Sequence, residues 1–193
     1  RNEKPIFEPI TLDVFQGDVV HVKGKNGSGK TTLLRMLIGA LHPSEGNIQY
    51  KHIDINRTRF EYLSNLVYVG HKVALKSSLT ALENLAWISG REKKCESLMK
   101  ALEDIGLSEK KNVLCSELSV GQQRKLTLAR ILVSGAKIWF LDEPFNTLDS
   151  DGFTLLKDLI EAHKNNQGIV VYASHQNVFI SDLKTIQLEK AVP

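Results

Sequence analysis

The stretch that decides the fold is GKNGSGKTT, residues 24–32. It matches the pattern G-x-x-x-x-G-K-[ST], with an apolar run (VVHVK) before it and a helix-forming run (TTLLRMLIG) after it. Glycines in such a turn permit backbone angles and close approaches that a β-carbon would block. Successive N–H groups can then face a phosphate at a helix N-terminus. Because strand, turn and helix are all in register, the pattern predicts a nucleotide phosphate site rather than a chance glycine-rich turn.

This turn predicts ATP and Mg²⁺ as ligands. Lys30 would reach the β- and γ-phosphate oxygens, and the Thr31 hydroxyl would hold Mg²⁺. The predicted ATP-binding residues are Gly24, Lys25, Asn26, Gly27, Ser28, Gly29, Lys30, Thr31 and Thr32.

A second motif, KIWFLDEP at residues 137–144, supplies carboxylates. An apolar strand ends in Asp142 and Glu143, and ligands of parallel sheets gather at the C-terminal edge of the strands. Asp142 is predicted to bind the Mg²⁺ shell. Glu143 is predicted to take a proton from the attacking water, a role worth about 10²–10⁴ in rate. Pro144 follows directly, which makes a helix-capping pair the less natural interpretation.

A third stretch, LSVGQQRKLTLAR at residues 118–130, has the ingredients of a second anion site. A serine hydroxyl and a glycine precede an amphipathic helix, whose N-terminus is positive. One chain therefore carries two predicted phosphate-binding motifs.

Bulk properties limit the remaining possibilities. The 193 residues are 42% hydrophobic, which fits one globular unit. The net charge of +3 has no clustered basic excess, so no nucleic-acid partner is expected. No apolar run approaches the roughly 20 residues that cross a bilayer. Cys95 and Cys115 lack metal or redox spacing, so we expect both to be buried, in a reducing compartment.

Hydrophobic periodicity predicts alternating strands and helices, and hence a mostly parallel sheet. The first block has strands near 10–15, 18–23, 47–50 and 66–69, with a helix at 30–38. From 80 to about 106 the pattern is helical, and one face carries Cys95, Leu98, Met99, Leu102 and Ile105. The second block has helices at 121–133 and 150–165 and strands at 137–141, 169–174 and 185–188.

The order of these motifs resembles that of the ABC-type ATPases. LSVGQ resembles the LSGGQ signature, and its residues are Leu118, Ser119, Val120, Gly121 and Gln122, with Val120 where a glycine usually stands. The acidic strand follows, then NTLD at 146–149 as a D-loop ending in Asp149, then His175 as a switch histidine. This resemblance covers essentially the whole chain.

The resemblance implies an α/β P-loop NTPase fold with an ABC-type helical subdomain and a small antiparallel β portion at the N-terminus. Residues 1–193 would form a single ABC ATPase domain. Its RecA-like core would cover about 1–70 and 116–193, and its helical lobe about 71–115.

In this family the signature of one subunit closes over the ATP held by the P-loop of another. The resemblance therefore implies an ATP-dependent homodimer with two complete sites. Glu143 and His175 would be catalytic, with His175 contacting the γ-phosphate and the attacking water. Four other histidines lack such a setting and are expected to have ordinary surface or core roles: His21, His42, His52 and His163.

One position departs from the family pattern. ABC ATPases usually place a glutamine where the core meets the helical lobe, and His71 occupies that slot here. An imidazole nitrogen can accept or ligate. His71 is therefore assigned to sensing Mg²⁺ or the water, beside Thr31 and Asp142.

This departure narrows the resemblance. YVGHK, LTALENL and DEPFNTLDSDG are similar to segments of the ATP-binding subunits of cytochrome c maturation haem exporters. That resemblance implies a peripheral protein on the cytoplasmic face of the bacterial inner membrane, paired with an integral membrane subunit. Haem, or a complex of the haem chaperone, would be an indirect partner, and this cargo rests on resemblance alone. Residues 73–82 are either the contact strip for the membrane subunit or an exposed loop over a small core.

Three alternative functions compete with this interpretation. Another cargo, such as a lipoprotein or a lipid, would use the same ATPase. A DNA-repair or ribosomal ABC protein would need a long coiled coil or a second cassette, and the sequence has neither. A nucleotide-binding module without turnover would lack Glu143 or His175, and both are present.

Overall fold

The computed structural model describes residues 5–70, 74–89 and 94–190. They divide into two compact units. The first comprises Arg1–Tyr68, Ala136–Pro144 and Ile160–Pro193, and the second comprises Val69–Gly135 and Phe145–Leu159. The predicted division into a core and a lobe at about 71–115 stays a prediction.

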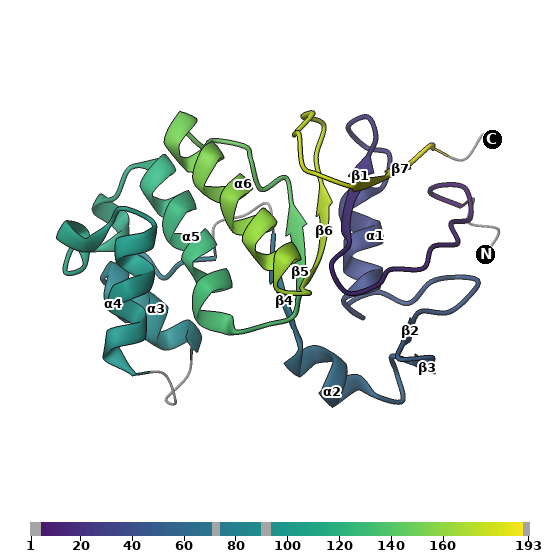
Figure 1. The fold of residues 1–193 in the computed structure, drawn as a ribbon, viewed down its shortest axis with the longest axis horizontal. Helices are drawn as coiled ribbons and strands as arrows, with labels where there is room; N and C mark the ends of the chain where they lie inside the picture. The colour runs from purple at the N-terminus through teal and green to yellow at the C-terminus, as the bar shows by residue number, and fades with distance from the viewer. Residues whose placement is uncertain (1–4, 71–73, 90–93, 191–193) are drawn as a thin grey trace. The chain divides into compact units, whose positions relative to one another are not determined.

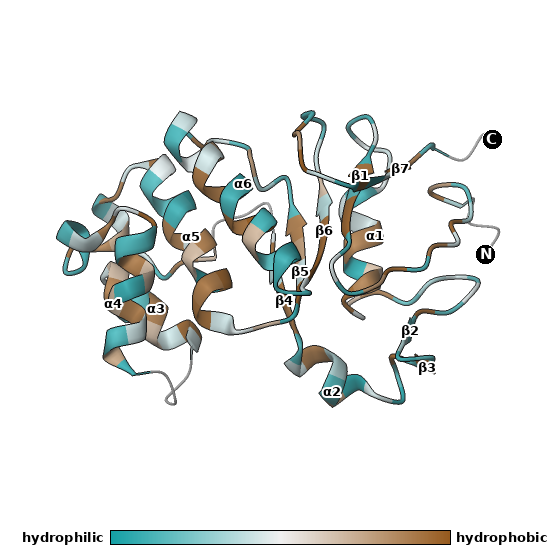
Figure 2. Cartoon of the chain, in the orientation of Figure 1, coloured by the Kyte–Doolittle hydropathy of each residue, from teal (hydrophilic) through white to brown (hydrophobic). Residues whose placement is uncertain are grey.

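A five-stranded sheet organises the first unit. Its strands lie in the order β4-β5-β6-β1-β7, and β1 pairs in parallel with β6 and β7, as β5 does with β6 (Figure 1). The strands are β1 (Val19–Lys23), β4 (Leu66–Val69), β5 (Ile138–Asp142), β6 (Ile169–Ala173) and β7 (Leu183–Gln187). All five residues of β5 are buried, and the strand is drawn mainly brown in Figure 2. Continuous burial of this kind is typical of a parallel strand covered on both faces, and the predicted fold class is confirmed.

The first unit also contains two helices and a small hairpin. Helix α1 (Lys30–Leu37) follows β1, and Leu34 of this helix packs with Val22 and Phe140 in the core. A two-stranded antiparallel hairpin joins β2 (Gln49–Tyr50) to β3 (Ile53–Asp54), and the short helix α2 spans Arg59–Ser64. The hairpin and an isolated antiparallel bridge between Phe7 and Lys190 are the small antiparallel portion.

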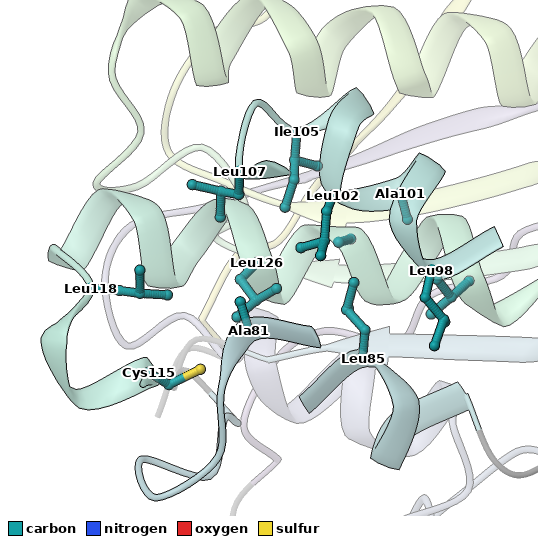
Figure 3. Packing of buried hydrophobic residues seen from close by; sticks show 12 residues of the cluster. Ala81, Leu85, Leu98, Ala101, Leu102, Ile105, Leu107, Cys115, Leu118 and Leu126 are labelled. Atoms are coloured by element: carbon teal, nitrogen blue, oxygen red, sulfur yellow. The ribbon is translucent and has the colours of Figure 1, made fainter. Parts of the chain in front are cut away.

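The second unit is helical. It contains α3 (Ala81–Ser89), α4 (Cys95–Asp104), the short 3₁₀ turns η1 (Ser108–Lys110) and η2 (Cys115–Glu117), α5 (Val120–Ser134) and the start of α6 (Ser150–Asn165). Leu85, Leu102 and Leu126 from three of these helices meet in one apolar cluster (Figure 3). Its packing depends on a stripe of apolar residues along one face of each helix.

Cys95 is a wrong prediction within this unit. It is exposed, whereas Leu98, Leu102 and Ile105 on the same predicted face are buried and Met99 is half-buried. Cys95 is the first residue of α4 and does not belong to the buried apolar cluster. Cys115 is buried, as predicted.

The predicted strand at 10–15 does not form. Ile10 and Val14 pack partly against the core, but the segment pairs with no strand among the described residues, so its alternation of apolar side chains produces no ladder. The helical pattern at 80–106 contains two helices rather than one continuous run. Other predicted elements agree to within a few residues, and the strand at 66–69 and the helix at 150–165 have the predicted bounds.

None of the helices in the described part of the chain combines the length and the hydrophobicity of a membrane span.

Candidate functional site

Three neighbouring strands of the first unit bring the predicted site residues to one edge of the sheet. The glycine-rich turn follows β1, Asp142 ends β5, and His175 lies two residues beyond the end of β6. Because β5, β6 and β1 are adjacent and parallel, their carboxyl ends meet at the same edge. The order of the strands thus assembles residues that are more than a hundred positions apart in the chain.

The turn that leads into α1 is shaped for a phosphate. Gly29 precedes the helix in a left-handed conformation with φ 98°, and it offers no side chain to cap the first N–H groups. A β-carbon on Gly24 would lie 2.9 Å from the carbonyl oxygen of Leu188, so this position requires glycine. The Ser28 hydroxyl oxygen is buried and has no hydrogen-bond partner among the described residues. Uncapped N–H groups and a buried hydroxyl fit the oxygens of a bound phosphate.

The side chain of Lys30 is held over this turn by backbone carbonyl groups of the turn itself. Its Nζ donates to the carbonyl oxygens of Gly24 at 2.9 Å and of Lys25 at 3.4 Å. The same nitrogen lies 3.5 Å from Oε1 of Glu143, and only 7% of the side chain is exposed. The ammonium group is therefore fixed between the glycine-rich turn and the Glu143 carboxylate.

The predicted Mg²⁺ ligands of the first unit are already in contact. The Thr31 hydroxyl donates to Oδ2 of Asp142 at 2.8 Å. Tyr68, on β4, also donates to this oxygen at 3.4 Å, a contact that the sequence did not predict. Burial, followed by the charge of Asp142, raises the pKa of Tyr68 above its ordinary value, so the phenol keeps its proton.

This pair fits Mg²⁺ chemically. A hydroxyl and a carboxylate are hard oxygen ligands, and Mg²⁺ usually takes only one or two protein carboxylates together with phosphate oxygens and water. Over the described residues, no group of three or more His, Cys, Asp or Glu side chains could hold a metal by itself.

Glu143 and His175 form a second contact at the same edge. Nδ1 of His175 lies 3.1 Å from Oε2 of Glu143. The backbone N–H of Glu143 donates to the carbonyl oxygen of Ala173 at 2.8 Å, and its φ of 47° is in the left-handed region. A non-glycine residue is held there only when its surroundings over-determine it, and such positions cluster at functional sites.

The signature residues lie in the second unit, where Ser119 caps helix α5. The Ser119 hydroxyl accepts from the backbone N–H of Gln122 at 3.2 Å, and Oε1 of Gln122 accepts from the backbone N–H of Ser119 at 3.0 Å. This reciprocal arrangement is a capping box. Because the hydroxyl accepts this bond, its own O–H can still donate to an anion. Val120 is 64% exposed, Leu118 is buried, and a β-carbon on Gly121 would lie 3.8 Å from the carbonyl oxygen of Thr147.

The D-loop residue Asp149 is tied to the same helix. Its Oδ1 accepts from the backbone N–H of Gly152 at 2.8 Å, which caps α6. Lys125, on α5, lies 3.0 Å from the same oxygen. The Gly152 N–H bond, followed by the bond from Lys125, lowers the pKa of Asp149. Signature helix and D-loop are thus joined by an ion pair that the sequence motifs alone did not reveal.

The predicted residues therefore fall into two sets. The glycine-rich turn, Asp142, Glu143 and His175 assemble in the first unit, and the signature and Asp149 assemble in the second. His71, assigned to Mg²⁺ or water sensing, lies outside the described residues, as does the start of the 73–82 strip.

A phosphate-binding turn, a carboxylate pair at a strand end and a separate signature helix define the class of ABC-type P-loop ATPases. A family model described as "ABC transporter" matches residues 7–146. The chain therefore belongs to the ABC transporter family, as an ATP-binding subunit and an ABC-type ATPase.

Within that family the chain is similar to proteins named "Cytochrome c biogenesis ATP-binding export protein CcmA". The relative from Histophilus somni is 38% identical over 193 residues, covering 98% of this chain and 89% of the relative. The relative from Haemophilus influenzae is 39% identical over 191 residues, covering 97% of this chain and 90% of the relative.

Solved structures agree on the fold. A putative ABC transporter ATP-binding protein from Pyrococcus furiosus matches with a TM-score of 0.86 and 28% identity, covering 99% of this chain and 95% of that one. The ATP-binding cassette MJ0796, described as a dimeric post-hydrolysis state bound to ADP and Pi, matches with a TM-score of 0.78 and 24% identity, covering 89% and 80%.

Proposed function

We propose that the first unit binds ATP at the turn of residues 24–32 and that Glu143 removes a proton from the attacking water. The water oxygen forms a bond to the γ-phosphorus, the bond between that phosphorus and the bridging oxygen of ADP breaks, and Glu143 accepts the proton. Lys30 neutralises charge on the phosphate oxygens. The observation that carries this proposal is the position of the Glu143 carboxylate, 3.5 Å from Nζ of Lys30 and 3.1 Å from Nδ1 of His175.

Thr31 and Asp142 are the residues that would hold Mg²⁺, which supplies positive charge to the β- and γ-phosphate oxygens when bound. His175 binds the γ-phosphate and orients the water through its contact with Glu143. His71 is a further candidate for sensing Mg²⁺ or the attacking water, because it occupies the position at which the family usually has a glutamine.

The complete site further requires a second copy of the chain. Ser119 and the N-terminus of α5 provide a donor hydroxyl and a positive helix end, and these would cover the γ-phosphate of ATP bound to the partner copy. Two-fold symmetry then gives two ATP sites from two chains. The exposed Val120, in place of the usual glycine, would lie at this interface.

The cargo is proposed to be haem for cytochrome c maturation. This rests on the relatives named for cytochrome c biogenesis and on the segments that resemble that group of subunits. An integral membrane subunit would carry the transport path, and this chain would bind it peripherally on the cytoplasmic face of the bacterial inner membrane. Haem or a haem-chaperone complex would contact the assembly rather than this chain.

A chromosomal Glu143→Gln exchange in the organism that encodes this chain tests the cargo. We expect covalently bound haem in c-type cytochromes, measured by haem staining of membrane proteins, to be lost, while b-type cytochromes stay at wild-type levels. Cys95→Ser, at an exposed residue outside both sets of site residues, is the matched control and should leave staining intact.

The alternative cargo has a different outcome. If Glu143→Gln leaves c-type cytochromes intact but impairs growth or the envelope, the ATPase powers transport of a lipoprotein or a lipid instead. A pull-down from solubilised membranes with the Glu143→Gln protein and Mg-ATP then identifies the integral subunit that it binds.

A further inference from the structure

His21 is a buried histidine in β1 that none of the roles above employs. It is 1% exposed, and its ring stacks on that of Tyr172 in β6, with centroids 4.4 Å apart and planes 13° apart. Its Nε2 lies 3.0 Å from the carbonyl oxygen of Ser174. A carbonyl oxygen can only accept, so Nε2 carries a proton and donates it. Burial lowers the pKa of His21, which keeps the ring neutral near pH 7.

The residue that receives this bond lies between β6 and His175. Strand β6 ends at Ala173, one residue before this carbonyl. The backbone N–H of Ser174 donates to the carbonyl oxygen of Val22 at 3.3 Å, and its carbonyl accepts from His21. Two successive residues of β1 therefore hold both sides of Ser174.

The Ser174 carbonyl belongs to the same planar peptide unit as the backbone nitrogen of His175. Fixing the direction of this carbonyl therefore fixes the plane from which the His175 side chain starts. The preceding carbonyl, of Ala173, accepts from the backbone N–H of Glu143. Two consecutive carbonyls, of Ala173 at the end of β6 and of Ser174 just beyond it, thus set the backbones of the two residues whose side chains meet 3.1 Å apart.

We propose that His21 is a positioning residue for ATP hydrolysis, which holds the Ser174 carbonyl and thereby aims His175 at Glu143 and the γ-phosphate. This inference rests on the role of His175 in the proposed function. His21 touches neither nucleotide nor water in this account, and it acts only through the peptide that it holds.

The chain provides a matched control in His163. Its ring stacks on Trp139 with centroids 3.7 Å apart and planes 11° apart, and its Nε2 lies 3.1 Å from the carbonyl oxygen of Lys137. Burial lowers the pKa of His163 as well. Lys137 directly precedes β5, at the end of the strand opposite to Asp142. His163 thus has the same kind of stack and bond, but it holds a carbonyl remote from the site edge.

The test compares His21→Leu, His21→Gln and His163→Leu. ATP affinity is measured by titration with a fluorescent ATP analogue, and kcat is expressed per competent binding site. His21→Leu leaves the Ser174 carbonyl without its donor and should lower kcat about tenfold or more, with ATP affinity within twofold of wild type. Glutamine offers an amide donor at a similar reach, so His21→Gln should keep kcat within about threefold.

His163→Leu should lower the unfolding temperature but keep kcat per site at the wild-type value. A purely structural His21 would behave in the same way, so an unchanged kcat per site in His21→Leu overturns the proposal. If His21→Leu does not fold, His21→Asn replaces it, because its shorter amide falls short of the Ser174 carbonyl. Equal kcat for His21→Asn and His21→Gln then contradicts the proposal.

A double variant separates this inference from the function beneath it. His175→Ala should lose most of kcat, and adding His21→Leu to it should cause no further loss, because His21 acts through His175. Multiplicative losses in the double variant overturn the positioning role alone. Wild-type kcat in His175→Ala overturns the role of His175 itself, and the positioning role with it.

Discussion

Thr31 and Asp142, 111 positions apart in the chain, are joined by a hydrogen bond of 2.8 Å from the threonine hydroxyl to Oδ2 of the carboxylate. The first residues of α1 and the end of β5 therefore bring two hard oxygen atoms together. Asp142 is 1% exposed, so its carboxylate is held by its neighbours rather than by bulk water.

Thr31→Val tests this pair. Valine has the shape of threonine without the hydroxyl, so the variant removes a metal ligand and a donor to Asp142. We expect the Mg²⁺ concentration for half-maximal ATPase activity to rise about tenfold. Binding of ATP in the presence of EDTA should stay within twofold of wild type. Thr31→Ser, which keeps the oxygen, is the control, and an unchanged Mg²⁺ dependence in Thr31→Val would falsify the assignment.

Glu143→Gln tests the general base. The amide keeps the size of the side chain but cannot take a proton, so kcat should fall by about 10²–10⁴. ATP should still bind, and the variant should accumulate as an ATP-dependent dimer, measured by light scattering during gel filtration. Monomeric elution at saturating Mg-ATP would count against both the catalytic role and the dimer.

Ser119→Arg tests the signature. The change removes the cap of α5 and adds bulk and positive charge at the predicted interface. Loss of the cap should cost about 1 kcal/mol of stability. ATP binding by the monomer should persist, whereas dimerisation in the Glu143→Gln background should be abolished. Ser119→Thr, which retains the capping hydroxyl, controls for the helix. Dimer formation by the arginine variant would contradict the role of the signature.

The buried histidines predict how stability depends on pH. Burial lowers the pKa of His21 and His163 in the folded chain below the ordinary 6.5. As pH falls below about 6.5, the unfolded chain binds protons that the folded chain refuses, so the free energy of unfolding falls. Each histidine can contribute at most about 1.4 kcal/mol per pH unit in this window. Urea unfolding at pH 7.5 and 5.5 measures the loss, which should be smaller in His163→Leu than in wild type.

Local motifs indicated the candidate site residues because a strand, a glycine turn and a helix are contiguous in sequence. The parallel sheet then followed from the alternation of strands and helices, and the adjacency of β5, β6 and β1 brought distant motifs to one edge. The segment 10–15 failed because alternation indicates which side chains point inward, but it does not provide a pairing partner. The short α2 and the two residues of β3 carry too few periods to be recognised.

The residues that contact the candidate site residues could not be predicted from the sequence, for a different reason. Tyr68 reaches Asp142, and His21 reaches Ser174, only through the order of the strands and their register, in which His21 lies opposite Tyr172. A lone histidine in an apolar strand carries no such information in its sequence. The ion pair of Lys125 with Asp149 was not predicted either, because its partners lie 24 positions apart in the chain.

The most direct measurement is ATPase turnover per chain as a function of protein concentration, with the purified chain at saturating Mg-ATP. Because each chain is proposed to lend its signature to the ATP of a second copy, turnover per chain should fall steeply on dilution below the dimer dissociation constant. Adding an excess of the double variant that carries both Ser119→Arg and Glu143→Gln to the diluted wild type should not restore turnover per wild-type chain. Constant turnover per chain down to concentrations at which light scattering detects only monomer would contradict the account.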